Sequence, residues 1–196
     1  AAHLVSGGTA GAYFTDQVSV EDAVSFIAAR SWLRWGQKGR TGTLGVWRIA
    51  PPGTPSYAIG VEHLLSEPTV LPLPEAVNPC LWRAVGGYAR NWTPMADADI
   101  ASSVTAARRQ FLRQQWRTTA QADTSRQTAN LLARSIELET VYDQESDAQS
   151  LLANLLTLFA PGRRLIEGTI PARRHLLELL ATHRLTHPRH GLSAGV

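Results

Sequence analysis

The sequence contains few of the residues on which thiol and redox chemistry depend. Its 196 residues include one cysteine, Cys80, and one methionine, Met95. A single cysteine excludes an internal disulfide and any metal cluster built on cysteines. Because Cys80 follows Pro79 at the start of a strand-like run, we expect it to be a small buried apolar residue.

Long apolar runs are also lacking. No stretch approaches about 18 uncharged apolar residues, so no transmembrane helix is expected. The first residues have no basic segment followed by a long apolar core, which argues against a signal peptide. They also have no initiator methionine, so we expect a processed chain or a piece of a longer one.

Lysine is nearly absent, so the positive charge comes from arginine. Lys38 is the single lysine among 19 Lys and Arg residues, which stand against 16 Asp and Glu residues and give a net charge of +3. This charge is spread along the chain, and it permits contact with nucleic acid without requiring it. Apolar residues make up 44% and charged residues 18%, which are values of a globular protein.

The sequence patterns of common catalytic sites are missing. There is no Gly-x-Ser-x-Gly, His-Glu-x-x-His or Walker pattern. The glycine-rich turn 36–42 has the composition of a phosphate loop, but it leads into a strand-like run instead of a helix. Asp97 and Asp99 stand at an expected helix start, where carboxylates interact with the helix dipole. We predict a protein that is not an enzyme and has no cofactor.

A histidine-rich stretch near the end of the chain is the strongest candidate for metal binding. His183 and His187 would share one face of a strand, with His190 and His175 nearby. No Asp or Glu lies between residues 181 and 196 to complete or orient such a site. We therefore predict no metal site and keep a histidine metalloprotein as a weaker alternative.

The chain divides by composition into three parts. Residues 1–18 contain several glycines and have little periodicity, so we expect a flexible lead-in in which Tyr13 and Phe14 pack onto the next element. Residues 19–79 are expected to form a helix–strand subdomain followed by a proline-rich connecting arm, and residues 80–196 an α+β domain. The boundary is expected near residues 66–79.

The first half has one clear helix and one clear strand. Ser19 can cap a helix whose first turn carries Glu21 and Asp22 and whose apolar spacing continues to about residue 33. Trp32 and Trp35 are expected to close that helix. After the turn 36–42, residues 43–49 alternate as a strand.

The second half is patterned more strongly. Residues 80–88 and 135–142 read as strands, and residues 143–146 begin the strongest amphipathic helix of the chain. Residues 120–133 are expected to form a shorter helix or a loop, and residues 187–192 a loop. Short strands are expected at 163–170, 175–180 and 184–186. The apolar positions of the strong helix are Ala148, Leu151, Leu152, Leu155, Leu156 and Phe159.

A helix is also expected from about Asp97 to about Arg117. Arg109, Arg113 and Arg117 recur every four residues, so this helix would carry them as one stripe. Such a stripe is usually a solvated face or a set of partners for carboxylates. As an alternative function, the three arginines would make the chain a small nucleic-acid-binding protein.

The stretch Gly86–Thr93 joins the proline-rich half to the helical half. The pair Gly86 and Gly87 weakens the strand that contains it, and we expect a bent edge strand that delivers Tyr88 and Trp92 to a packed seam. Pro94 then ends the strand. We interpret the stretch as a structural corner, since large aromatic residues beside glycine usually serve packing.

Four segments, taken together and in order, resemble one known family. They are 50–53 after a strand, 85–93 before a helix, Asp147–Ala148 opening a leucine-rich helix that ends in Arg163–Arg164, and 185–192. This order resembles the tail-tip (baseplate hub) proteins of tailed bacteriophages and gene transfer agents, over roughly residues 20–196. The turn expected before the final loop departs from the family, because residues 180–183 read Leu-Ala-Thr-His where Leu-Gly-Asp is usual.

The resemblance implies a structural role in the virion. Proteins of this kind form a ring, typically a homotrimer, that closes the tail tube, contacts the distal tail ring and the tape-measure protein, and opens for DNA passage. Such a chain is made in the bacterial cytoplasm and ends in the phage tail tip. The resemblance implies an α+β fold of small mixed or antiparallel β-barrel-like sheets with amphipathic helices outside. Its corner residues would be Gly86, Gly87, Tyr88, Asn91 and Trp92, and Arg163 and Arg164 would start a barrel strand.

Overall fold

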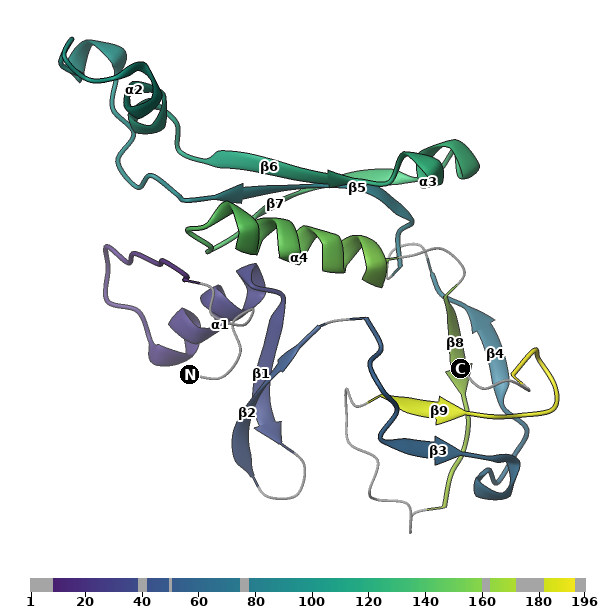
Figure 1. Ribbon diagram of the computed structural model, residues 1–196. Coiled ribbons are helices and arrows are strands. Elements are labelled where there is room, and N and C mark those ends of the chain that lie inside the picture. Colours follow the sequence, from purple (N-terminus) through teal and green to yellow (C-terminus); the bar gives the residue numbers. More distant parts are fainter. Residues whose placement is uncertain are drawn as a thin grey trace.

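The protein has the mixed α+β architecture that the sequence predicts (Figure 1). The computed structural model describes residues 9–38, 42–49, 51–74, 78–159, 163–171 and 182–192. Within these ranges it has four α-helices: α1 (Val20–Arg30), α2 (Ala106–Arg113), α3 (Thr124–Ala129) and α4 (Glu145–Leu158). Two 3-10 turns lie at Val61–His63 and Asp97–Asp99.

The strands of the described ranges form four small sheets. Three sheets have two strands, and the fourth has three strands in the order β6-β5-β7. None of them closes into a barrel within the described ranges, so the fold is α+β without the barrel-like closure that we expected. The strands are β1 (Leu33–Lys38), β2 (Thr43–Arg48), β3 (Tyr57–Ile59), β4 (Thr69–Pro72), β5 (Leu81–Tyr88), β6 (Arg117–Ala122), β7 (Arg134–Glu139), β8 (Arg164–Glu167) and β9 (His183–Leu185).

Strand β5 is the centre of the three-stranded sheet, so the prediction of an edge strand is wrong. It pairs antiparallel with β6 and parallel with β7. The glycine pair does not mark a bulge, because the register of β5 with β7 shifts earlier, between Leu81 and Arg83. The glycines instead make room on both faces of the sheet. A Cβ at Gly86 would lie 3.2 Å from Leu152 Cδ1, and one at Gly87 would lie 3.1 Å from Trp116 Cε3.

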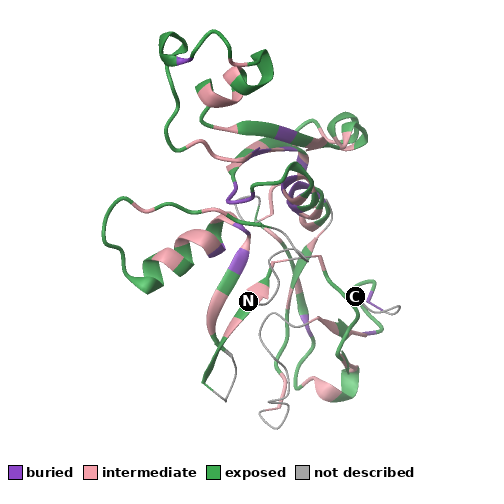
Figure 2. Ribbon diagram, turned by 60° about the vertical axis from the view of Figure 1, so that its left-hand side comes forward, coloured by how far each residue is buried: buried purple, intermediate pink, exposed green. Residues whose placement is uncertain are grey.

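The core lies between this sheet and α4, as the leucine pattern predicts. Ala148, Leu151, Leu152, Leu155 and Leu156 of α4 are all buried. Leu152 and Leu156 pack with Leu81 and Ala84 of β5, and Ile136 and Leu138 of β7 pack against the same cluster. Buried ribbon is concentrated at α4 and the three-stranded sheet, with further buried positions where α1 meets β1, and the rest is intermediate or exposed (Figure 2).

Helix α1 begins at the predicted cap and ends earlier than expected. The Ser19 side chain accepts a hydrogen bond from Asp22 N, as predicted. The helix ends at Arg30 because Trp32 takes a left-handed backbone conformation, with φ of 53°, and turns the chain into β1. Trp35 therefore belongs to a strand, and β1 and β2 pair as an antiparallel hairpin.

The sequence before α1 packs onto neighbouring elements. The Phe14 ring meets the Phe26 ring of α1 edge to face at 5.5 Å, so the expected packing onto the next element is found for Phe14. Tyr13 meets Trp92 instead. Gly11 N donates to Val141 O at 2.8 Å, and Ala10 forms an isolated bridge with Tyr142. Cys80, which we expected to be buried, is half-buried.

The predicted helix from Asp97 to Arg117 is broken into three parts. A 3-10 turn covers Asp97–Asp99, α2 starts only at Ala106, and Arg117 already belongs to β6. Thr105 caps α2 with its side chain, which is a position that threonine favours over a helix interior. Strand β6 was missed because its Thr, Gln and Ala residues show no apolar alternation, and pairing with β5 determines its conformation.

The proline-rich stretch is more than a connecting arm. Its strand β3 pairs parallel with β9, and its strand β4 pairs antiparallel with β8 (Figure 1). These pairs join residues 57–72 to residues 164–185, across the boundary predicted near 66–79, and that boundary stays a prediction. The shorter helix expected in 120–133 is α3, the strand expected at 163–170 contains β8, and the predictions for 175–180 lie outside the described residues.

Replacing Leu152 by alanine tests the packing of α4 on β5. Leu152 is fully buried at Gly86, so Leu152→Ala should lower the free energy of unfolding by about 2 to 5 kcal/mol. Urea unfolding followed by circular dichroism measures this change. Leu131→Ala is the control, because Leu131 is 95% exposed and its loss should change stability by less than about 0.5 kcal/mol. Equal effects of the two substitutions would contradict this packing.

Candidate functional site

The backbone turns sharply where β5 ends. Ala89 has φ of 46°, a left-handed value that is uncommon for a residue with a side chain. Its N–H donates to Tyr142 O at 2.8 Å. Just before the turn, the buried Thr140 hydroxyl donates to Gly87 O at 2.8 Å. The end of β5 is thus fastened to residues 140–142, which follow β7.

Asn91 ties the turn to the end of α2. Its Nδ2 donates to Leu112 O at 2.9 Å and to Phe111 O at 3.4 Å. These carbonyls lie in the last turn of α2, where helix carbonyls lack partners within the helix. Asn91 Oδ1 accepts from Thr93 N at 3.1 Å, and Asn91 N donates to Gln115 O at 2.8 Å. One amide side chain therefore holds both its own loop and the helix end.

Trp92 contacts one aromatic ring, that of Tyr13, and the guanidinium of Arg90. The Arg90 guanidinium lies 4.1 Å from the centre of the Trp92 ring and 5.0 Å from that of Trp116. Tyr13, from the segment before α1, meets Trp92 with a centroid distance of 5.9 Å. The Trp92 side chain is nevertheless 37% exposed, so the seam is packed on one side and open on the other. Contacts of this kind stabilise by about 0.5 to 2 kcal/mol each.

Tyr88 belongs to a polar group between β5, β6 and α4. Its hydroxyl donates to Glu145 Oε2 at 3.3 Å. Glu145 Oε1 accepts from Thr119 Oγ1 and from Gln149 Nε2, each at 3.1 Å. Burial raises the pKa of Tyr88, and the nearby Glu145 carboxylate raises that pKa further. The group holds the first turn of α4 to the sheet.

The five predicted corner residues thus lie at or beside one turn. Gly86 and Gly87 admit Leu152 and Trp116, Tyr88 bonds to α4, Asn91 holds α2, and Trp92 meets Tyr13. These contacts join the turn to α2, α4 and the segment before α1, so the five residues serve packing. Among these contacts none forms a nucleophile with an adjacent base.

The three arginines of the predicted stripe do not share a helix face. Arg109 and Arg113 of α2 both approach Asp97 Oδ1, at 3.3 and 3.5 Å. Arg117 lies in β6, with its guanidinium 4.2 Å from the centre of the Phe111 ring. The first two arginines therefore serve as partners of a carboxylate, and the geometry favours nucleic-acid contact by these three residues less than the sequence pattern does.

The histidines of residues 183–190 have different surroundings. His187 is buried and its Nδ1 accepts from Arg189 N at 3.2 Å, while His183 Nδ1 lies 3.4 Å from Ser56 Oγ. His190 Nε2 lies 3.3 Å from Glu67 Oε1. His175 lies outside the described ranges. Within those ranges no three His, Cys, Asp or Glu side chains are grouped so as to hold a metal ion.

Glu67 links the proline-rich stretch to the final loop. Both of its carboxylate oxygens lie 3.0 Å from Arg189 Nη1. The hydrogen bond from Arg189 lowers the pKa of Glu67, and His190 contributes in the same direction. The sequence alone could not pair these residues, because they meet only where the strand pairs β3–β9 and β4–β8 bring distant segments together.

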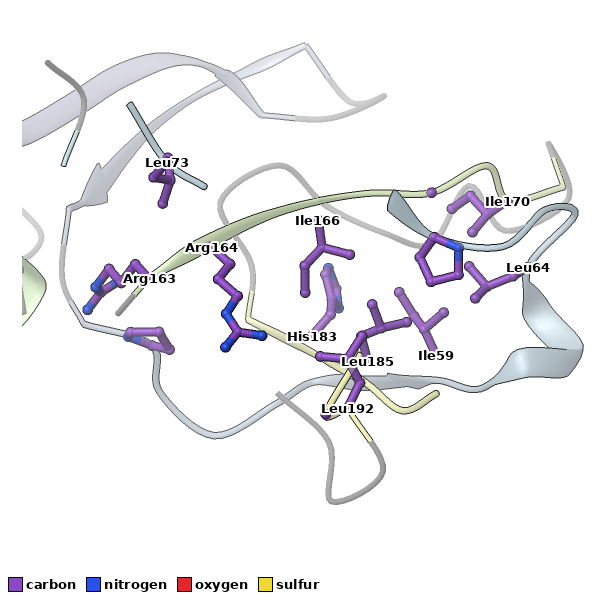
Figure 3. A pocket seen from close by; sticks show the side chains of 14 residues that line it. Ile59, Leu64, Leu73, Arg163, Arg164, Ile166, Ile170, His183, Leu185 and Leu192 are labelled. Atoms are coloured by element: carbon purple, nitrogen blue, oxygen red, sulfur yellow. The ribbon is translucent and has the colours of Figure 1, made fainter. Parts of the chain in front are cut away.

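An open apolar cavity of about 920 Å³ lies between these strand pairs (Figure 3). Ile59 of β3, Ile166 of β8 and Leu185 of β9 converge on it, with the side chains of Arg163 and Arg164 toward one end. The described residues of its lining include no carboxylate or thiol. The lining is mostly apolar, and its ionisable side chains are His183, Arg163 and Arg164.

Comparison with known proteins assigns no relationship: no family model matches the chain, and no curated protein matches its sequence. The described helices include none with the length and apolar character needed to cross a membrane.

Asn91→Ala tests how firmly the corner is held. The substitution removes the side-chain hydrogen bonds to Leu112 O and Thr93 N, while Leu112 O keeps the bond from Met95 N at 2.9 Å, so the free energy of unfolding should fall by about 0.5 to 1.5 kcal/mol. Hydrogen exchange in α2 should speed up at the same time. Gln110→Ala, an exposed change on the same helix, should stay within about 0.5 kcal/mol. If the two variants unfold alike, Asn91 does not hold the corner.

The titration of Tyr88 tests the polar group at Glu145. The folded pKa of Tyr88 is raised, so its contribution to stability is complete below the unfolded pKa of about 10 and is lost as the pH rises through the folded pKa. Glu145→Gln should lower this pKa without removing the part due to burial. NMR titration of isotope-labelled tyrosine measures it. Tyr142, whose pKa is raised by its own burial, should titrate unchanged, and an unaltered Tyr88 would contradict the assignment.

Proposed function

We propose that this chain is a structural component of the tail tip, or baseplate hub, of a tailed bacteriophage or gene transfer agent. In this role it assembles into a ring, of three copies by resemblance, that closes the tail tube and takes part in DNA passage. Its partners are other tail proteins, namely the distal tail ring, the tape measure and the tail tube. The chain works by assembly and not by catalysis.

Two of the segments that carry the resemblance support the proposal, because they lie together in the packed part of the fold. Residues 85–93 comprise the end of β5 and the turn that follows it, and Asp147 and Ala148 lie in the first turn of α4. Residues 185–192 follow β9 and reach Glu67 through Arg189. Residues 85–93 and 147–148 therefore lie together where β5 meets α4, whereas residues 163–164 and 185–192 lie in and beside the small strand pairs.

The observation that carries the proposal is a set of exposed apolar side chains beside unpaired strand edges. Leu44 and Val46 of β2 are 74% and 54% exposed, and Leu131 and Leu132 before β7 are 95% and 77% exposed. Within the described ranges both strands are outermost in their sheets. Monomeric proteins usually cover or charge such edges, so these surfaces favour a protein that is completed by neighbours.

Labelling of purified particles tests the proposal. An antibody against this chain, followed by gold labelling and electron microscopy, should mark one end of the tail, and image reconstruction should place the chain in a ring there. An antibody against the tail tube should mark the tube along its length, as a control. The proposal would be overturned if particles carry no label and the purified chain binds no tail protein.

A further inference from the structure

The β1–β2 hairpin is a sheet of only two strands. In the part of the chain that the structure describes, β2 pairs with β1 and with no other strand. A two-stranded hairpin is marginally stable by itself in water and gains from a third strand or a packed face. Helix α1 covers part of one face, since Trp35 Nε1 donates to Ser25 Oγ at 3.1 Å. Val46, directly opposite Trp35, shares that face and remains 54% exposed.

The open edge of β2 presents a defined set of backbone groups. Ile49 N donates to Trp32 O across the hairpin, so the backbone of Ile49 points toward β1. Because the direction alternates along a strand, the N–H and C=O groups of Leu44, Val46 and Arg48 point outward. The same three residues are exposed. This edge therefore offers both hydrogen bonds and apolar contact.

The hairpin is strongly basic. The stretch 31–49 contains Arg34, Lys38, Arg40 and Arg48 and no acidic residue, although the whole chain carries a net charge of only +3. Two such hairpins would repel each other if their edges met. A complementary partner would be an acidic strand edge.

Strand β7 has the matching edge. It pairs with β5 on one side, and Arg134 N and Thr140 N donate to Cys80 O and Gly87 O of that side. By alternation the backbone groups of residues 135, 137 and 139 point outward, and Glu137 and Glu139 are exposed there. The exposed Leu131 and Leu132 come just before this strand.

We propose that the β2 edge of one copy pairs with the β7 edge of a second copy. The β2 edge joins Leu44 and Val46 to the basic Arg48. The β7 edge joins the preceding leucines to the acidic Glu137 and to Glu139, whose Oε2 also lies 3.9 Å from Arg30 Nη2 of the same chain, and the strand begins with Arg134. The two edges belong to different sheets, with the hairpin extending away from the three-stranded sheet (Figure 1). A contact between two different surfaces of one chain is head-to-tail, so it repeats from copy to copy and closes into a ring when the rotation allows. This inference deepens the assembly proposed above and rests on it.

Charge reversal in the purified 196-residue chain tests the pairing. Arg48→Glu and Glu137→Arg each place like charges at the contact, so each variant alone should associate about tenfold or more weakly than the wild type in sedimentation velocity. An equal mixture of the two variants should associate again, because each edge then meets an opposite charge. Arg34→Glu changes the same charge on β1, away from the β2 edge, and should associate nearly as the wild type does.

Hydrogen exchange gives the second measurement. Raising the concentration of the wild-type chain should slow exchange at Leu44 and Val46, whose N–H groups point outward, and leave the neighbouring Gly45 and Trp47 unchanged. The pairing would be overturned if the mixture of variants stays dissociated, if Arg34→Glu weakens association equally, or if the wild type stays monomeric at every concentration. None of these outcomes would prevent gold labelling of the tail tip. A labelled tail tip without this pairing would therefore refute the pairing and leave the proposed function standing.

Discussion

The fold depends on the close approach of α4 to the middle of β5. This approach is possible because β5 has no side chain at Gly86, where the fully buried Leu152 rests against the strand. Gly87 gives the same freedom to Trp116 on the opposite face, since successive strand residues point to opposite sides. Because β5 has no side chain at these two positions, Leu152 packs closely on one face of the strand and Trp116 on the other. The strands β6 and β7 then pair along its two edges.

Residues 140–142, which follow β7, hydrogen-bond to the end of β5, to the turn after it and to the segment before α1. Thr140 bonds to Gly87, Tyr142 O receives Ala89 N, and Val141 O receives Gly11 N. Tyr142 is buried with Leu151 and Leu155 of α4, so these bonds lie beside the core. Residues 140–142 therefore contact the three-stranded sheet, the corner, α4 and the segment before α1. The hairpin and the small strand pairs lie farther from that point, and they carry much of the exposed apolar surface.

The sequence predicts the parts of the structure that depend on local pattern. The spacing of Leu151, Leu152, Leu155 and Leu156 identifies α4, and Ser19 identifies the start of α1. Local sequence patterns predict the wrong secondary structure where pairing with a distant strand determines the backbone conformation. The polar β6 becomes a strand because it pairs with β5. The arginine repeat predicted one long helix, but in the structure α2 begins only after its cap Thr105, and Arg117 lies in β6. For the candidate site, the glycines and aromatic residues of the stretch Gly86–Thr93 predicted a corner, and the family resemblance added Asn91. The side chains that these residues contact could not be predicted, and the link from Glu67 to Arg189 required the strand pairs of the whole fold.

The stretch Gly86–Thr93 is a packed corner of the fold, and we propose that the protein is completed by assembly. Native-state hydrogen exchange at Ala89 and Asn91 tests the corner most directly, because their N–H groups bond to Tyr142 O and Gln115 O. If the corner is packed as described, both amides should exchange about as slowly as those of β5, in one cooperative unit with α4. Exchange of these two amides at nearly unprotected rates, while β5 stays protected, would contradict it.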